Sequence, residues 1–224
     1  MLSRRGRSAL VVGLGGMRLA EVVWSARNLR RAGGGSQAAP RSFPLMVSVN
    51  VALFGLCIVP RRRRPPLVLE LAALTGLLAA VGLRLWVISC LGPAWNVKAV
   101  VPEGMEVVTR GPYRWIRHPN YLAVILEFAA LPVAVGAYPE AVALSAANAA
   151  VLVPRIRAEE ALLERVPGYR EAFAGVPRLL PGLDRWAART RSPGGRRCAW
   201  LLSDPGQMPA RESQSRGDSR RKPQ

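Results

Sequence analysis

Five apolar runs separated by polar segments set the pattern of this 224-residue chain. They cover residues 9–24, 43–60 and 67–91, and then the two halves of the stretch 121–153. Tyr138-Pro139 interrupts the last stretch near its middle, which indicates two helices joined by a tight turn. Runs of about 15 to 25 residues are typical of helices in or near a bilayer. The pattern predicts an all-α integral membrane bundle of about five transmembrane segments.

The segments outside the runs differ from them in composition. Residues 25–42 contain arginines and a Gly-Gly-Gly-Ser stretch, so we expect a linker there. After Glu160, leucine and aromatic positions continue up to Phe173 in a way that predicts an amphipathic helix at the membrane surface, closing the site described below. Residues 183–224 are rich in Arg, Ser, Pro and Gly, which is typical of disorder. We expect one membrane domain over residues 1–182, followed by this basic tail.

The composition supports a membrane protein. Half of the residues are hydrophobic, yet the formal net charge is +18. A soluble globular protein rarely combines such a high hydrophobic content with such a high net charge. A small membrane protein does so when its loops and tail carry the arginines. The tail is basic but lacks interleaved aromatic residues. We therefore expect its arginines to be attracted to membrane lipids, and we expect no nucleic-acid partner. The three cysteines fit no metal or disulfide spacing, and we expect no metal site.

Polar residues bracket the last apolar hairpin, and they include His118, the only histidine in the chain. A hairpin returns both of its ends to one face, so the His118 end and residues 155–160 are expected to lie side by side. A helix that begins near His118 carries a partial positive charge at that end, which attracts carboxylates and phosphates. Arg155 and Glu159 are four residues apart and share one helix face. One positive and one negative group there would suit a zwitterionic ligand.

These groups also have simpler interpretations. The aromatic and arginine residues around His118 would suit an anchor at the membrane interface, and residues 155–160 would suit the start of a solvated helix. Glu127 does not fit either interpretation, because a carboxylate about two turns inside an apolar helix needs a partner or a function. Arg84, in the third apolar run, is expected to pair with Glu127 or with Glu21.

The residues that bracket the hairpin resemble those of a known family. Residues 111–121 read Gly-Pro-Tyr-Arg-x-x-Arg-His-Pro-Asn-Tyr, and residues 155–163 read Arg-Ile-x-x-Glu-Glu-x-x-Leu. Together they resemble the isoprenylcysteine carboxyl methyltransferase family, whose members are integral membrane enzymes that use S-adenosylmethionine. The similarity spans residues 91–181, which would form the catalytic part, and a looser similarity to the first helix of the bacterial branch covers residues 18–21 and 27–28. It implies transfer of a methyl group to an oxygen of a lipophilic acceptor.

The resemblance also implies roles for individual residues. Arg155 would bind the methyl acceptor, and the cofactor would contact Glu106, Val107, Val108, Tyr113, His118, Pro119, Asn120, Tyr121 and Glu159. Met105 stands where eukaryotic members have a histidine, which favours a long-chain phenolic or pyrone lipid over an isoprenylcysteine carboxylate, and both stay open. A carboxylate acceptor needs no base. A phenol would need one, for which His118 is the first candidate and Glu127 the second.

The expected orientation follows from the arginines and from the cytosolic cofactor. Both place the site on the cytoplasmic face of a bacterial inner membrane, although the cluster Arg61–Arg64 then falls on the outer side. The oligomeric state stays undetermined by the sequence. A different class of function, a non-enzymatic transporter subunit or scaffold, would also account for charged residues at membrane depth.

Overall fold

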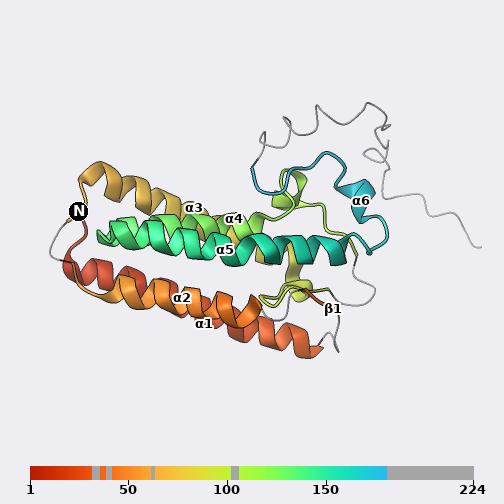
Figure 1. Ribbon diagram of the computed structural model, residues 1–224, viewed down its shortest axis with the longest axis horizontal. Coiled ribbons are helices and arrows are strands. Elements are labelled where there is room, and N and C mark those ends of the chain that lie inside the picture. Colours follow the sequence, from red (N-terminus) through yellow and green to blue (C-terminus); the bar gives the residue numbers. More distant parts are fainter. Residues whose placement is uncertain (32–35, 39–41, 62–63, 102–105, 181–224) are drawn as a thin grey trace, which may run out of the picture. The chain divides into compact units, whose positions relative to one another are not determined.

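The computed structural model of the protein describes residues 1–31, 36–38, 42–61, 64–101 and 106–180. The expected basic tail, 183–224, lies outside the described residues, as does Met105. The described part is mostly helical (Figure 1). Its long helices are α1 (Arg4–Arg31), α2 (Ser42–Ile58), α3 (Leu67–Leu91), α4 (Pro119–Val135) and α5 (Tyr138–Leu163).

Three of these helices are long and apolar enough to cross a membrane by length and composition: α1, α3 together with the turn that follows it, and α5. The other two, α2 and α4, are apolar but have 17 residues each, which is short of the roughly 20 that a bilayer core requires. The helical bundle is therefore confirmed, with three helices that have the length and composition to cross a membrane. The count of five membrane-crossing segments stays a prediction.

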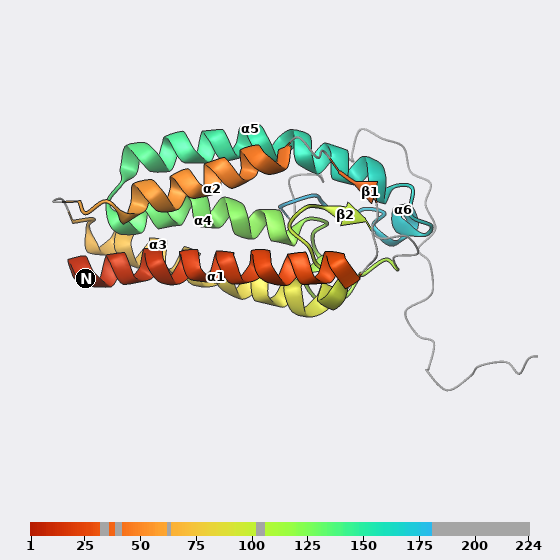
Figure 2. The ribbon, with the colours of Figure 1, turned by 90° about the horizontal axis from the view of Figure 1, so that it is seen from below.

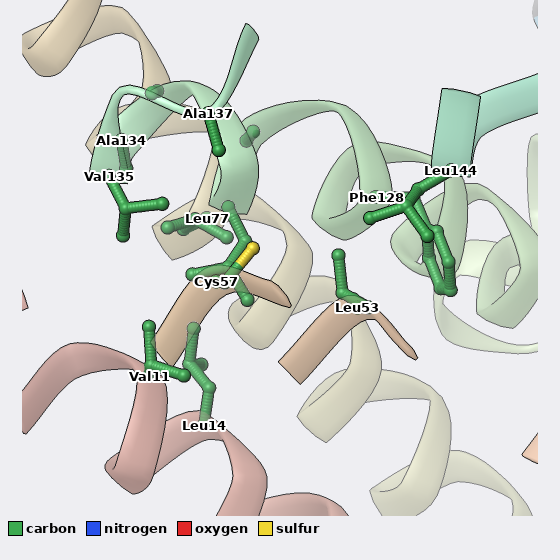
Figure 3. Close-up of a cluster of buried hydrophobic side chains, with 13 residues drawn as sticks. Val11, Leu14, Leu53, Cys57, Leu77, Phe128, Ala134, Val135, Ala137 and Leu144 are labelled. Atoms are coloured by element: carbon green, nitrogen blue, oxygen red, sulfur yellow. The ribbon is translucent and has the colours of Figure 1, made fainter. Parts of the chain in front are cut away.

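Helix α4 lies in the middle of the bundle, with α2 and α5 on one side and α1 and α3 on the other (Figure 2). All five long helices contribute buried apolar side chains to one core (Figure 3). Its members include Val11, Leu14, Leu53, Cys57, Leu77, Phe128 and Leu144. A core built from every helix fixes their relative positions, because interiors packed this densely tolerate little displacement.

The predicted hairpin is confirmed. Helix α4 ends at Gly136, whose φ of 83° lies in the left-handed region that glycine adopts without strain. Its backbone N–H donates to Val133 O at 3.1 Å, and helix α5 begins at once with Pro139 in its first turn. The two helices therefore run back along each other, and the end of α5 returns to the beginning of α4.

The expected linker 25–42 is wrong in its first part, because α1 continues through it to Arg31. Polar side chains of this last part of α1 bond to the segment after α3. Ser25 Oγ accepts a hydrogen bond from Val97 N at 3.0 Å, and Asn28 Nδ2 donates to Trp95 O at 2.8 Å. Two short antiparallel strands, β1 (Ser36–Gln37) and β2 (Val100–Val101), continue this contact. These hydrogen bonds between distant residues stabilise the last part of α1, where the sequence alone predicted a linker.

The amphipathic helix expected after Glu160 is not formed as one piece. Helix α5 ends at Leu163, and only the four-residue helix α6 (Tyr169–Ala172) follows, after Gly168 with a φ of 81°. The chain then returns to the beginning of α4. Arg117 N donates to Pro177 O at 2.9 Å, and His118 N donates to Arg178 O at 3.0 Å. Strands β1 and β2 and helix α6 therefore gather at the end of the bundle where α4 begins and α5 ends (Figure 2).

Candidate active site

A cavity of about 830 Å³ lies at this end of the bundle. One part of its wall comes from α1 and α2 and is largely apolar. Another part comes from the segment 94–101 and from residues 117–121, and includes the polar beginning of α4. The volume falls within the range of about 300 to 1,000 Å³ that is usual for small-molecule sites. The cavity therefore joins a polar region to an apolar region between two helices.

Most of the residues singled out by the sequence line this cavity. They are Val107, Val108, Tyr113, His118, Pro119, Asn120, Tyr121, Arg155 and Glu159. The two motifs, which the hairpin separates in sequence, therefore meet at one cavity. Glu106 is exposed, and neither it nor Glu127 is among the lining residues in the described part of the chain.

Tyr121 connects the two motifs directly. Its hydroxyl donates to Glu159 Oε2 and accepts a hydrogen bond from Arg155 Nε at 3.0 Å. The Arg155 guanidinium is 1% exposed and also donates to Ser42 Oγ at 3.1 Å and to Val97 O at 2.6 Å. These three acceptors are uncharged, and no carboxylate of the described residues forms an ion pair with Arg155. A buried cation with only neutral partners is suited to bind an anionic or strongly polar group of a ligand.

His118 is held by a second carboxylate. Its Nε2 lies 3.2 Å from Glu160 Oε1, and both side chains are buried. Arg178 donates to the same carboxylate through Nε at 3.0 Å and Nη2 at 2.8 Å. Because an ionised carboxylate only accepts hydrogen bonds, this contact places a hydrogen on Nε2, and Nδ1 is the nitrogen on the other side of the ring. Glu160 therefore fixes the orientation of the histidine.

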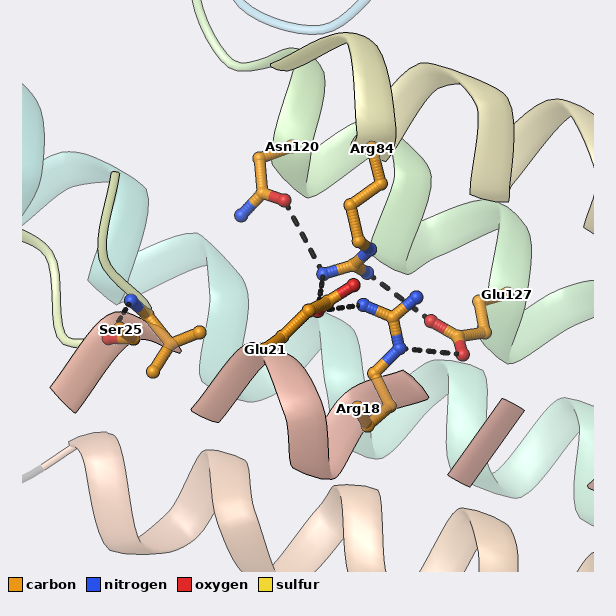
Figure 4. Close-up of polar contacts among 7 residues, drawn as sticks. Arg18, Glu21, Ser25, Arg84, Asn120 and Glu127 are labelled. Carbon is orange, nitrogen blue, oxygen red and sulfur yellow. Dashed lines mark hydrogen bonds and ion pairs between the residues drawn. The ribbon is translucent and has the colours of Figure 1, made fainter. Parts of the chain in front are cut away.

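A cluster of four charged residues lies deeper in the bundle. This ion-pair cluster consists of Arg18 and Glu21 of α1, Arg84 of α3 and Glu127 of α4 (Figure 4). Glu127 accepts from Arg18 Nε at 3.2 Å and from Arg84 Nη2 at 3.3 Å. Glu21 pairs through Oε2 with Arg18, and with Arg84 Nη1 at 3.5 Å. Two guanidinium groups thus face two carboxylates, which makes burial of all four tolerable.

The cluster settles the alternatives for Arg84, because this residue pairs with both expected partners, Glu21 and Glu127. It also gives Glu127 two arginine partners, Arg18 and Arg84. Glu127 does not line the cavity in the described part of the chain. Because a base must reach the proton that it removes, the role of Glu127 as a second candidate base gains no support here and stays a prediction. Arg84 further donates to Asn120 Oδ1 at 3.4 Å, which connects the cluster to the first turn of α4.

Two tyrosines outside the long helices are held in their neutral form. Burial raises the pKa of Tyr113 far above its ordinary value, and Glu159 raises it further. Burial also raises the pKa of Tyr169 to about 12, although Arg117 opposes this shift. Neither phenol ionises near neutral pH, so both act in the cavity as hydrogen-bonding or aromatic groups rather than as bases.

Sequence reasoning assigned no ligand role to several residues of the cavity wall. Trp95, Tyr169 and Phe173 line it, as do Arg18, Glu21 and Arg84 of the ion-pair cluster. Tyr169 and Phe173 belonged to the family resemblance and to the apolar side of the expected amphipathic helix, without a role in ligand binding. Two signals pointed to α1: the looser resemblance that includes residues 18–21, and the expectation that Arg84 pairs with Glu127 or with Glu21.

The comparisons with known proteins concern the part of the chain that contains both motifs. Residues 71–165 match the isoprenylcysteine carboxyl methyltransferase (ICMT) family, which confirms the resemblance and supports a membrane methyltransferase in general. YpbQ, an uncharacterized protein of Bacillus subtilis (strain 168), is 44% identical over 81 residues, or 36% of this chain. The match covers 48% of that relative's length, so the chain spans about half of it.

Proposed function

Because residues 71–165 match the isoprenylcysteine carboxyl methyltransferase family, we propose that the protein is an S-adenosylmethionine-dependent O-methyltransferase of the membrane. Its acceptor is a lipophilic molecule that reaches the cavity from the bilayer. The observation that carries the proposal is the meeting of the two sequence motifs at one cavity, where Tyr121 bonds to both Glu159 and Arg155. A cavity with polar and apolar parts suits a polar cofactor beside a lipid-like acceptor.

The residues present fit S-adenosylmethionine. Glu159 supplies a carboxylate for its polar groups, and the aromatic rings of Tyr113, Tyr121 and Phe173 suit a positively charged sulfonium. Two buried polar atoms of the wall, Trp95 Nε1 and Tyr169 Oη, have no hydrogen-bond partner among the described residues. Such atoms suit a ligand that hydrogen-bonds to them. When bound, S-adenosylmethionine supplies a methyl group on an excellent leaving group.

The protein's contribution is then orientation and exclusion of water. Glu159 and the residues around His118 hold the cofactor, and Arg155 directs the acceptor oxygen towards it. A carboxylate acceptor is already ionised and suits the Arg155 guanidinium, whereas a phenolic or pyrone hydroxyl must lose a proton. His118, with Nδ1 as its acceptor atom, is one candidate for that step among the residues that line the cavity. The cytoplasmic face of a bacterial inner membrane is the proposed location, because the cofactor is cytosolic.

The alternative of a transporter subunit or scaffold has less support. It relied on charged groups at membrane depth, and Arg84, Glu21 and Glu127 have one another and Arg18 as partners. Binding of S-adenosylmethionine to the detergent-solubilised protein, measured by calorimetry, separates the two, because a transporter or scaffold has no reason to bind it.

The test is methyl transfer in membranes that contain the chain, with methyl-labelled S-adenosylmethionine and a crude lipid extract. We expect His118→Ala and Glu159→Ala to abolish transfer while the protein stays in the membrane. The matched control is Glu164→Ala, one helical turn beyond Glu160, where the carboxylate pairs with the exposed Arg170 and with no other cation of the described residues. Full activity of either site variant would contradict the assignment.

The labelled product identifies the acceptor class. Release of methanol by mild alkali indicates a methyl ester and a carboxylate acceptor. Label that withstands alkali indicates an ether on a phenolic or pyrone hydroxyl.

A further inference from the structure

The carboxylate of Glu21 uses only one of its two oxygens. Oε2 receives both Arg18 and Arg84, whereas Oε1 is buried and accepts no hydrogen bond from the described residues. Figure 4 shows the dashed lines meeting at one oxygen of this group. The residue is 6% exposed and lines the cavity. A buried carboxylate oxygen without a donor is unfavourable by itself and suits a ligand that brings a donor to it.

Glu127, the other carboxylate of the ion-pair cluster, differs in this respect. Its Oε1 accepts from Arg18 and its Oε2 accepts from Arg84, and it does not line the cavity in the described part of the chain. The cluster is therefore asymmetric: both oxygens of Glu127 accept from arginines, whereas Glu21, the carboxylate that lines the cavity, has one oxygen that accepts no hydrogen bond from the described residues. Charge balance alone does not require this difference.

Glu21 also lies between the two parts of the cavity. Towards the polar part, one guanidinium nitrogen, Arg84 Nη1, contacts both Glu21 Oε2 and Asn120 Oδ1, two residues after His118. Towards the apolar part, the wall continues along α1 and α2 through Leu19, Met46, Val47, Val51 and Phe54. A molecule with an aliphatic chain between α1 and α2 would therefore present its polar end at Glu21.

We propose that Glu21 is the proton acceptor for a methyl acceptor whose reacting group is a hydroxyl on an aliphatic-chain lipid. This rests on the proposed function above. Oε1 accepts the hydroxyl hydrogen bond. The hydroxyl oxygen forms the new bond to the methyl carbon while the carbon–sulfur bond breaks and its electron pair stays on sulfur. The hydroxyl proton passes to Oε1, and water removes it after the product leaves.

The same oxygen discriminates between acceptor classes. An ionised carboxylate at this position would bring a second negative charge against Oε1 and could donate nothing to it, which disfavours binding. The charged groups that face Glu21 are Arg18 from α1, Arg84 from α3 and Glu127 from α4. The two guanidinium groups bond to Oε2 and to Glu127, so Oε1 remains the group that meets the hydroxyl.

The experiment uses a 4-nitrophenol with a dodecyl chain, because its ionised form is yellow and its pKa when bound is read from absorbance. The full-length protein in detergent is titrated with the probe from acid to alkaline pH. Glu21 opposes formation of the phenolate, so we expect the bound probe to have a pKa about one unit higher in the wild type than in Glu21→Gln. Glu127→Gln is the matched control, and most of the shift should remain in it.

Methyl transfer to a long-chain alkylphenol gives the second readout. Glu21→Gln should lower its rate about 100-fold, the lower range for loss of a general base, with an unchanged affinity for S-adenosylmethionine in calorimetry. An equal loss of the shift in both variants would show a structural role for Glu21 and overturn the proposal. Two results with the wild type would also overturn the proposal: a bound probe that is mostly ionised at neutral pH, and no binding of the probe. Both are measured without any variant, so they do not depend on whether a variant folds. Failure of the wild type to bind S-adenosylmethionine would remove the proposed function, and this proposal with it.

Discussion

Replacing Arg84 by methionine tests whether the ion-pair cluster holds the bundle together. Arg84 is 5% exposed and pairs with both carboxylates of the cluster, at 3.5 Å from Glu21 and 3.3 Å from Glu127. Arg84→Met leaves these two buried carboxylates with a single guanidinium, that of Arg18. Breaking a buried ion pair from one side costs about 3–5 kcal/mol, because the remaining charge has lost its partner. We expect a loss of that size in the free energy of unfolding, measured by SDS titration in mixed micelles.

Two further variants make the measurement specific. Arg84→Met combined with Glu127→Gln leaves the neutral pair Arg18 and Glu21, so it should recover at least half of the loss although it removes two polar groups. Arg170→Met breaks an exposed ion pair with Glu164 and should cost no more than about 1 kcal/mol. If Arg84→Met is as stable as Arg170→Met, or if the double variant is less stable than Arg84→Met, the cluster does not balance its charges as argued.

Two other predictions concern a turn and a tyrosine. Gly111 has a φ of 63°, and an added Cβ would overlap Cys90 Sγ, so Gly111→Ala should lower the free energy of unfolding by about 1–3 kcal/mol. Adding Cys90→Ala to this variant should restore only the part of the loss that is due to the overlap. Full recovery of the free energy of unfolding would show that the backbone is not strained. Tyr169 has its pKa raised from 10.0 to about 12, so the folded state holds this proton more tightly and its stabilising effect, complete below pH 10, is lost as the pH rises to about 12. SDS titrations over this range should show a smaller fall for Tyr169→Phe than for the wild type, and equal falls would contradict the shift.

The features predicted correctly from the sequence are those that depend on neighbouring residues. The length of the apolar runs gave the positions of α2 and α3 to within about two residues, which is the usual uncertainty of a helix end. The break at Tyr138-Pro139 gave the hairpin, and the hairpin gave the meeting of the two motifs. The partners of Arg84 were also foreseen, because a buried arginine in a small bundle has few carboxylates to choose from.

The features that were missed depend on contacts between distant residues. Arg18 and Glu127 are 109 positions apart, and Arg178 reaches Glu160 from a segment expected to follow a surface helix. Helix α1 continues to Arg31, because Ser25 and Asn28 bond to the segment after α3.

The sequence by itself determined the helices, the hairpin and the residue types at its polar end. Run length, proline positions and helical spacing are local properties, and they limit a chain in a bilayer to few arrangements. Only the tertiary structure decided which charge each of these groups meets. It gave Glu127 two guanidinium partners and left one oxygen of Glu21 without a donor among the described residues, because the approach of α1 to α3 and α4 selects the partners of each carboxylate.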